Sequence, residues 1–136
     1  MRAIWLILFL CTAFICGDAR AQSSPASDEI IARGKALVEA GDCASCYTAD
    51  PAKPFAGGKR IDTPFGAIYS PNLTPDKDTG IGAWSDQDFH RALREGISPR
   101  GSRYYPAFPY PYFTKMTRDD IQAIRAYLAT QTPVRN

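Results

Sequence analysis

Two cysteines spaced three residues apart carry the clearest chemical signal in this 136-residue sequence. Cys43 and Cys46 form a Cys-x-x-Cys pair, which proteins use for zinc binding, for thiol–disulfide exchange and for covalent attachment of haem. Zinc needs further cysteine or histidine ligands, and only His90 remains for that role beyond the N-terminal segment. Exchange of the thioredoxin type needs a βαβ context, and no strands are apparent. Covalent haem attachment uses Cys-x-x-Cys-His, whereas the fifth residue here is Tyr47.

The first 21 residues are typical of a cleavable secretory signal peptide. A cationic start at Arg2 precedes an apolar run from Ala3 to Cys16, and Ala19-Arg20-Ala21 matches a small-x-small cleavage site. The apolar run is too short for a membrane-spanning helix. We therefore expect export to the periplasm, no membrane span in the mature chain, and only two remaining cysteines in an oxidising compartment.

The composition indicates one globular domain. Apolar residues make up 45% of the chain and charged residues 22%, with a formal net charge of +2. This balance excludes a disordered polar tail, and so small a charge argues against nucleic-acid binding. All 11 prolines and nine of the ten glycines follow the signal peptide. So many turn-forming residues predict short helices, long loops and a thin core that needs a filler other than side chains.

Three short helices are expected to frame the cysteines. The first covers residues 28–40, with acidic residues in its first turn and a stop at Gly41. The second starts after the N-cap Ser85 and ends before Gly96. The third starts after Thr117. Its apolar face consists of Ile121, Ile124 and Leu128.

Two long loops rich in proline and glycine connect these helices, over residues 42–83 and 97–113. A loop as long as the first is unusual in a compact domain unless it wraps something. Residues 22–27 are predicted to be a mobile lead-in and residues 134–136 a tail. The remaining segment, 28–133, is predicted to be an all-α domain.

Short motifs follow one another along the loops in an informative order. They are Gly41-Asp42-Cys43-Ala44-Ser45-Cys46, Lys53-Pro54-Phe55-Ala56-Gly57-Gly58, Thr63-Pro64-Phe65-Gly66-Ala67-Ile68-Tyr69-Ser70, Asn72-Leu73-Thr74-Pro75-Asp76, Thr79-Gly80-Ile81-Gly82 and Tyr105-Pro106-Ala107-Phe108-Pro109-Tyr110. Together they closely resemble the class I cytochrome c domains in the cytochrome c subunits of membrane-bound alcohol, aldehyde and gluconate dehydrogenases. The resemblance extends from Asp28 to Pro133, nearly the whole mature chain.

This resemblance implies an all-α, cytochrome c-like fold of three or more short helices whose long loops wrap one haem c. It implies covalent attachment of the haem to Cys43 and Cys46. The haem pocket that it implies consists of Phe65, Tyr69, Tyr105, Pro106 and Phe108. It also implies that the first and last helices cross at Gly34 and Tyr127.

Both axial-ligand positions of the family differ in this sequence. Tyr47 stands where the resemblance implies the proximal histidine, and Phe108 stands where it implies the distal methionine. Tyrosine can bind ferric haem as a phenolate, and such a hard anionic oxygen stabilises Fe(III) and lowers the reduction potential. His90 and Met116 are two further candidate iron ligands. The commoner alternatives are that His90 is an ordinary surface residue and that Met116 fills a gap in the packing.

These features lead to three functional hypotheses. The first is a periplasmic electron carrier, not an enzyme, that connects a dehydrogenase with the respiratory chain through a terminal oxidase or a quinone-linked complex. The second is a haem-poor structural or interaction protein with a Cys43–Cys46 disulfide. The third is an open, five-coordinate haem bound by Tyr47, with peroxidase-like or gas-binding behaviour. A cluster of arginines has two possible roles: it steers an acidic redox partner, or it forms an ordinary solvated face. Its members are Arg91, Arg94, Arg100 and Arg103.

Overall fold

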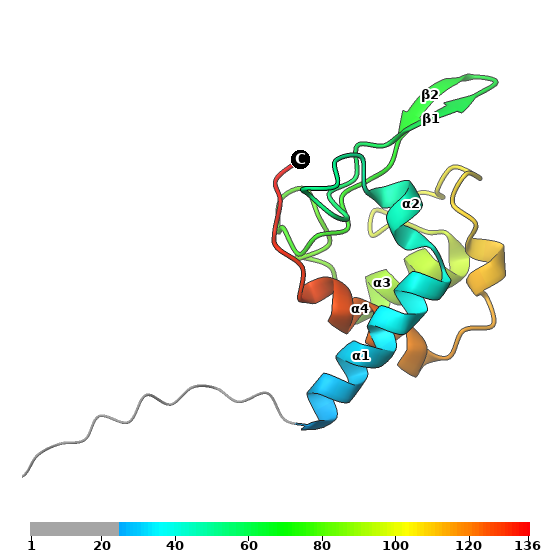
Figure 1. Cartoon of the computed structure of the whole chain (residues 1–136). Coiled ribbons are helices and arrows are strands. Elements are labelled where there is room, and N and C mark those ends of the chain that lie inside the picture. The colour runs from blue at the N-terminus through cyan, green and yellow to red at the C-terminus, as the bar shows by residue number, and fades with distance from the viewer. Residues whose placement is uncertain (1–24) are drawn as a thin grey trace, which may run out of the picture.

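Helices supply most of the frame of this chain, and a hairpin projects from it (Figure 1). The structure, a computed structural model, describes residues 25–136, and the predicted signal peptide, residues 1–21, lies outside them. The elements are α1 (Pro25–Ala40), α2 (Cys43–Tyr47), β1 (Arg60–Thr63), β2 (Gly66–Tyr69), α3 (Asp86–Glu95), the 3₁₀ helix η1 (Tyr110–Phe113) and α4 (Arg118–Ala129). Within this described part, no helix is both long and apolar enough to cross a membrane.

The crossing of α1 and α4 is set by Gly34. A Cβ atom on this residue would lie 1.9 Å from the backbone oxygen of Ala123 and 2.9 Å from the Cβ of Tyr127, so only glycine allows so close an approach. Beside this contact, the guanidinium of Arg33 donates to the carboxylate of Asp120 over 2.6 Å. The predicted crossing at Gly34 and Tyr127 is confirmed.

The ends of α3 and α4 follow the predicted caps. The Ser85 hydroxyl accepts the backbone N–H of Asp88, and the Asp88 carboxylate accepts that of Ser85, each over 3.1 Å, which completes a capping box. Gly96 ends α3 in the left-handed region at φ 65°. At the start of α4, the Thr117 hydroxyl accepts the backbone N–H of Asp120 over 3.1 Å. The predicted second and third helices are therefore confirmed.

The first helix begins earlier than predicted. Its first residue is Pro25, and proline suits this place because the first turn has no use for a backbone N–H donor. Residues 25–27 thus belong to α1 and not to the predicted mobile lead-in, whose residues 22–24 lie outside the described part of the chain. The end of α1 at Ala40, just before Gly41, agrees with the prediction.

The predicted loop over residues 42–83 contains one helix and two strands that the sequence pattern did not indicate. Helix α2 has only 5 residues, too few for an apolar period to be visible. Strands β1 and β2 form an antiparallel hairpin in which Arg60 pairs with Tyr69 and Thr63 pairs with Gly66. Residues of β1 alternate between exposed and half-buried positions and those of β2 do not, and four residues in each strand are too few to make such a pattern visible in the sequence. The expectation of no strands is wrong at this hairpin, and η1 likewise interrupts the second predicted loop.

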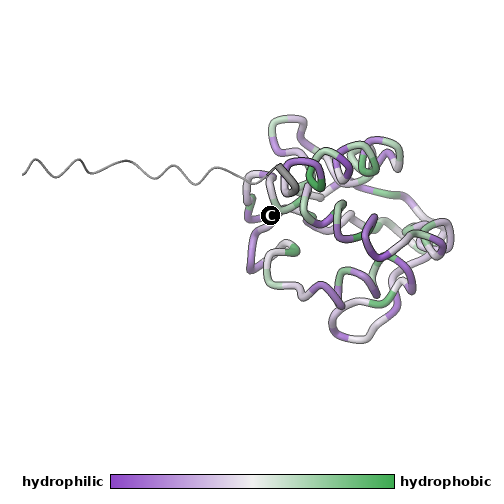
Figure 2. The backbone as a smooth tube through the Cα atoms, turned by 90° about the horizontal axis from the view of Figure 1, so that it is seen from below, coloured by the Kyte–Doolittle hydropathy of each residue, from purple (hydrophilic) through white to green (hydrophobic). Residues whose placement is uncertain are grey.

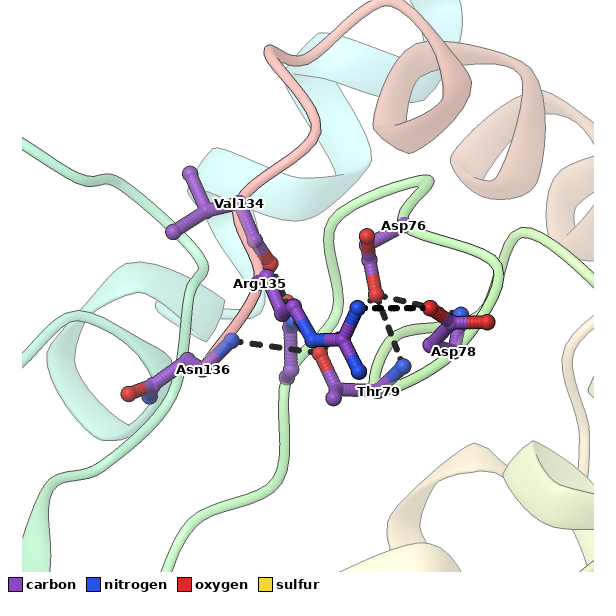
Figure 3. A network of polar contacts seen from close by, with 7 residues as sticks. Asp76, Asp78, Thr79, Val134, Arg135 and Asn136 are labelled. Carbon is purple, nitrogen blue, oxygen red and sulfur yellow. Dashed lines mark hydrogen bonds and ion pairs between the residues drawn. The ribbon is translucent and has the colours of Figure 1, made fainter.

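The last three residues of the chain, predicted to be a tail, are tied by hydrogen bonds to the loop between β2 and α3. The Asn72 amide donates to the Val134 backbone oxygen over 2.6 Å, and the Asn136 backbone N–H donates to the Thr79 hydroxyl over 3.2 Å. The neighbourhood drawn in Figure 3 includes Asp76, Asp78, Thr79, Val134, Arg135 and Asn136. This network fixes the loop against the end of α4.

A small hydrophobic core lies between α1, α3 and α4. Its buried members are Val38, Phe55, Ile81, Phe89, Ile121, Ile124 and Leu128. Two of them, Phe55 and Ile81, come from the long loop, which is therefore anchored in the core. Figure 2 shows hydrophilic and hydrophobic residues in close alternation along the described chain, as expected for helices that each bury one narrow stripe.

Candidate functional site

A cavity of about 310 Å³ opens beside this core, and several elements meet around it. Helices α1, α3 and α4 line it with Leu37, Phe89, Ala92, Leu93, Ile124 and Leu128. The hairpin adds Ile61, Ile68 and Tyr69, and the loop after α3 adds Tyr104, Tyr105 and Phe108. Among the described lining residues, Asp42 is the one with a side chain that is charged at neutral pH. The cavity therefore suits a large apolar group.

Both cysteines line this cavity from α2. Because Cys43 and Cys46 are three positions apart on one helix, their side chains lie on the same face. Asp42, just before the helix, adopts a left-handed φ of 48° and turns the chain from α1 into α2. Both cysteines are free thiols in this structure. Burial is the main cause that raises the pKa of the Cys43 thiol, so that this thiol is neutral.

Tyr47 ends α2 and also lines the cavity. Its backbone oxygen accepts the N–H of Gly57 over 2.8 Å, which connects α2 to the long loop. Burial raises the pKa of its half-buried phenol well above the usual value, and the neighbouring Cys43 adds to this shift. The phenol is consequently neutral in the chain without a cofactor.

Phe108 belongs to an aromatic cluster on the cavity wall. Its ring meets that of Tyr104 edge to face, with centroids 5.8 Å apart and planes at 82°. The ring of Phe113 lies 6.0 Å from it at an angle of 39°. The backbone N–H of Phe108 donates to the Tyr105 oxygen over 3.0 Å, which holds the turn that carries it. The phenylalanine rings give this part of the wall no group that can bind a metal.

The structure brings three of the five predicted pocket residues to the cavity with the cysteines: Tyr69, Tyr105 and Phe108. The first two lie at its edge, with 63% and 42% of their surface exposed. Phe65 and Pro106 are not among the lining residues. Phe65 lies in the turn between β1 and β2, where 90% of its surface is exposed. This hairpin projects away from the helices (Figure 1).

The two further candidate iron ligands lie in different places. His90 is not a lining residue, and its buried Nδ1 has no hydrogen-bond partner among the described residues. Burial, assisted by the positive charges of Arg118 and Arg94, lowers the pKa of His90. Met116 does line the cavity and packs against the core just before α4. In the described part of the chain, the cavity wall thus contains one thioether and no histidine.

Several lining residues were not expected from the sequence. They include Leu37, Ile61, Ile68, Trp84 and Tyr104. Ile61 and Ile68 are direct partners across the hairpin, and they therefore lie on one face of it. If the segment Thr63-Pro64-Phe65-Gly66 had been recognised as a β-turn, the pairing of Ile61 with Ile68 would have followed from it. Trp84 directly precedes the cap Ser85, the position where a hydrophobic staple places an apolar side chain.

The donor set and the wall fit a haem that is attached through sulfur. Two thiols open onto an apolar cavity from one face of a short helix, and the aliphatic and aromatic side chains around them match the apolar faces of a porphyrin. Cys43 and Cys46 would hold the group. For the iron, this wall offers the oxygen of a tyrosine such as Tyr47 or the thioether of Met116.

Known proteins are similar to this chain over the segment that forms the site. One of the subunits of nicotinate dehydrogenase from Pseudomonas putida is 53% identical over 109 residues, which cover 80% of this chain and 9% of that protein. The gluconate 2-dehydrogenase cytochrome c subunit of Pantoea cypripedii is 46% identical over 102 residues, covering 75% and 23%. The cytochrome c subunit of the alcohol dehydrogenase (quinone) of Gluconacetobacter polyoxogenes is 42% identical over 123 residues, covering 89% and 26%.

The chain therefore spans between 9% and 26% of the length of these relatives. The family model described as Cytochrome c matches residues 31–132, which contain both cysteines, the cavity wall and the crossing of α1 and α4. This match confirms the resemblance that the loop motifs indicated. The mostly helical fold expected from that resemblance is confirmed as well. This chain belongs to the cytochrome c family, whose members bind haem c and transfer electrons.

Proposed function

We propose that this chain is a periplasmic electron carrier that holds one haem c in the cavity through Cys43 and Cys46. The observation that carries this proposal is that both thiols line the same apolar cavity. Cys43 and Cys46, which are free thiols here, would hold the group by adding their S–H bonds across its two vinyl groups. Each hydrogen would go to the other vinyl carbon, so no oxidant or reductant would be needed.

When bound, the haem supplies an iron that alternates between the ferric and ferrous states, while the chain controls its surroundings. Leu37, Phe89 and Leu93 line the cavity and would keep water away from the macrocycle, which would reduce the solvent reorganisation that accompanies electron transfer. Tyr47, which directly follows Cys46 in the sequence and lines the same cavity, would offer an oxygen to the iron. A tyrosine oxygen favours the ferric state, and we therefore expect a lower reduction potential than that of an iron with histidine and methionine ligands.

The proposed electron donor is a dehydrogenase, from which electrons continue to the respiratory chain. Two of the relatives are named as cytochrome c subunits of gluconate and alcohol dehydrogenases. Arg100 and Arg103 are exposed on the loop that carries Phe108, whereas Arg94 donates to the Thr114 backbone oxygen over 2.9 Å. These two arginines precede the lining residues Tyr104 and Tyr105 on the same loop, and their positive charge would attract an acidic partner.

Expression of the full chain in a bacterium that matures c-type cytochromes tests the proposal. We expect an exported protein that begins after Ala21 and retains one haem under denaturing conditions, with the pyridine haemochrome spectrum of two thioether bonds. The Cys43→Ala/Cys46→Ala variant is the control, and it should be exported without covalent haem. A colourless, folded protein with a Cys43–Cys46 disulfide would contradict the proposal and favour the structural role.

A further inference from the structure

The hairpin of β1 and β2 has two strand edges without a strand partner. Within the described residues the sheet consists of these two strands, and the hairpin projects from the helices (Figure 1). An isolated two-stranded hairpin has marginal stability, and an uncovered strand edge is a template for pairing with another chain. The turn of this hairpin is nevertheless fixed, because the Thr63 hydroxyl donates to the Gly66 oxygen over 2.6 Å. The hairpin therefore presents a preformed edge.

The outward main-chain groups of β1 are those of Arg60 and Asp62. At the base of the hairpin, the Ser70 N–H donates to the Lys59 oxygen over 2.9 Å, so these two residues form a hydrogen-bonded pair. Hydrogen-bonded and non-hydrogen-bonded pairs alternate along an antiparallel ladder, and the next pair, Arg60 with Tyr69, is therefore of the second kind. The N–H and C=O groups of Arg60, and two residues later those of Asp62, consequently point away from β2. In the part of the chain that the structure describes, neither residue has a main-chain hydrogen bond outside the hairpin.

Arg60 and Asp62 also carry opposite charges on one face of β1. Side chains two positions apart on a strand share a face, and the Arg60 guanidinium donates to the Asp62 carboxylate over 2.7 Å. Both side chains stay open to solvent, with 61% and 76% of their surface exposed. Ile61, between them, lies on the other face and is half-buried. Along its outer edge, β1 thus has a positive, an apolar and a negative residue in succession.

This succession is complementary to itself when a second copy runs antiparallel. If Ile61 of one copy lies opposite Ile61 of the other, Arg60 of each copy lies opposite Asp62 of the other. The outward main-chain groups of these two residues then face each other and can form hydrogen-bonded pairs. A register centred on Arg60 or on Asp62 would instead place like charges opposite one another, which is destabilising. Charge and main-chain pairing therefore favour the same two-fold symmetric register.

We propose that two copies of this chain associate through β1, in the register centred on Ile61, and form a four-stranded antiparallel sheet. The partner is a second copy because the edge of β1 complements itself in both charge and hydrogen bonding. The edge of β2 lacks this pattern, since its outward residues, Ala67 and Tyr69, are uncharged at neutral pH. In the dimer, the turn of each hairpin comes beside the base of the other hairpin. Phe65, with 90% of its surface exposed in the single chain, thereby gains a surface to pack against. Haem attachment is not required for this association.

Sedimentation equilibrium of the exported chain over a range of protein concentrations tests the dimer. We expect a monomer–dimer equilibrium for the wild type. Arg60→Asp and Asp62→Arg each place like charges opposite one another in both pairs, and each should weaken association by at least about tenfold. The double variant Arg60→Asp/Asp62→Arg exchanges the two charges, and it should associate within about threefold of the wild type. A monomeric wild type, or single variants that dimerise as well as the wild type, would overturn the proposal.

The two single variants are also complementary to each other. When they are mixed in equal amounts, opposite charges meet in both pairs, and we expect a heterodimer at least as strong as the wild-type dimer. Its formation would show that the separate variants are folded, and a mixture that stays monomeric would contradict the register.

Amide hydrogen exchange identifies the edge that pairs. The N–H groups of Arg60 and Asp62 should become protected as the protein concentration rises. The N–H groups of Ala67 and Tyr69, on the edge of β2, are the control and should exchange at an unchanged rate. Protection of the β2 groups alone would place the contact on the other edge and overturn the proposal.

Discussion

Gly34 of α1 and Ala123 of α4 are in backbone contact, since a Cβ on Gly34 would lie 1.9 Å from the Ala123 oxygen. We expect Gly34→Ala to push the helices apart and to lower the free energy of unfolding by about 2 to 3 kcal/mol, despite a gain of about 1 kcal/mol in helix propensity. Urea denaturation measures this change. The control is Ala36→Gly at an exposed position of the same helix, which should cost about 1 kcal/mol. A Gly34→Ala chain as stable as the wild type would contradict the close approach.

Asn72 connects the long loop with the end of the chain through both atoms of its amide. Its nitrogen donates to the Val134 oxygen and to the Thr79 hydroxyl over 2.6 and 2.9 Å, and its oxygen accepts the Thr74 backbone N–H over 2.8 Å. Asn72→Asp sets a buried carboxylate oxygen against the Val134 oxygen, and we expect a loss of about 3 kcal/mol in unfolding free energy at pH 7. Asn136→Asp, at an exposed residue, is the control with a smaller expected loss. Thermal unfolding measures both variants. If Asn72→Asp and Asn136→Asp lowered the unfolding free energy equally, the proposed role of Asn72 would be contradicted.

We expect Asp120 to make the stability of the fold depend on pH. The hydrogen bond from the Thr117 side chain, together with Arg33, holds the pKa of this carboxyl below its ordinary value of 3.8. A carboxyl with a depressed pKa in the folded state stabilises the fold above its unfolded pKa, and this contribution disappears as the pH falls through the folded value. We expect the urea midpoint to decrease between about pH 4 and pH 2, and to decrease less steeply in Asp120→Asn. Identical pH profiles for the two proteins would show that Asp120 makes no such contribution.

Tyr47 holds the position after Cys46 at which histidine completes the haem-attachment motif. We expect Tyr47→His to raise the amount of covalent haem per chain, because the maturation machinery of the family is expected to recognise this histidine along with both thiols. With Phe108→Met added, the iron should gain a nitrogen and a thioether ligand and become low-spin. The haemochrome assay and the optical spectrum measure the two effects, with Tyr47→Phe as the control that removes only the oxygen. A double variant that binds no haem would contradict the proposed pocket.

Local sequence signals were sufficient to predict where α3 and α4 begin, because the N-cap residues of both helices are close to their partners in the sequence. Ser85 with Asp88 and Thr117 with Asp120 close hydrogen bonds within one turn, so short stretches of sequence already contain both partners. The crossing of α1 and α4 at Gly34 was instead predicted from the family resemblance, since its partner lies far along the chain.

The long loop could not be predicted in the same way, because its structure depends on contacts between its own distant parts. A Cβ on Gly57 would lie 2.4 Å from the Pro71 oxygen, an approach that no local pattern indicates. The placement of Phe65 shows the same limit. Its motif associated it with the pocket, but the register of the hairpin puts it in the projecting turn. A side chain in such a turn is placed by strand pairing and not by its hydrophobicity.

Cys43 and Cys46 share one cavity as free thiols, and each sulfur atom can form only one new covalent bond. Oxidation to one another and addition to a macrocycle therefore exclude each other on any single molecule. If haem is attached as proposed, the fraction of molecules that carry it would depend on the rate of haem delivery relative to the rate of thiol oxidation. Two cells that synthesise this polypeptide at the same rate would then contain different amounts of the haem-loaded form.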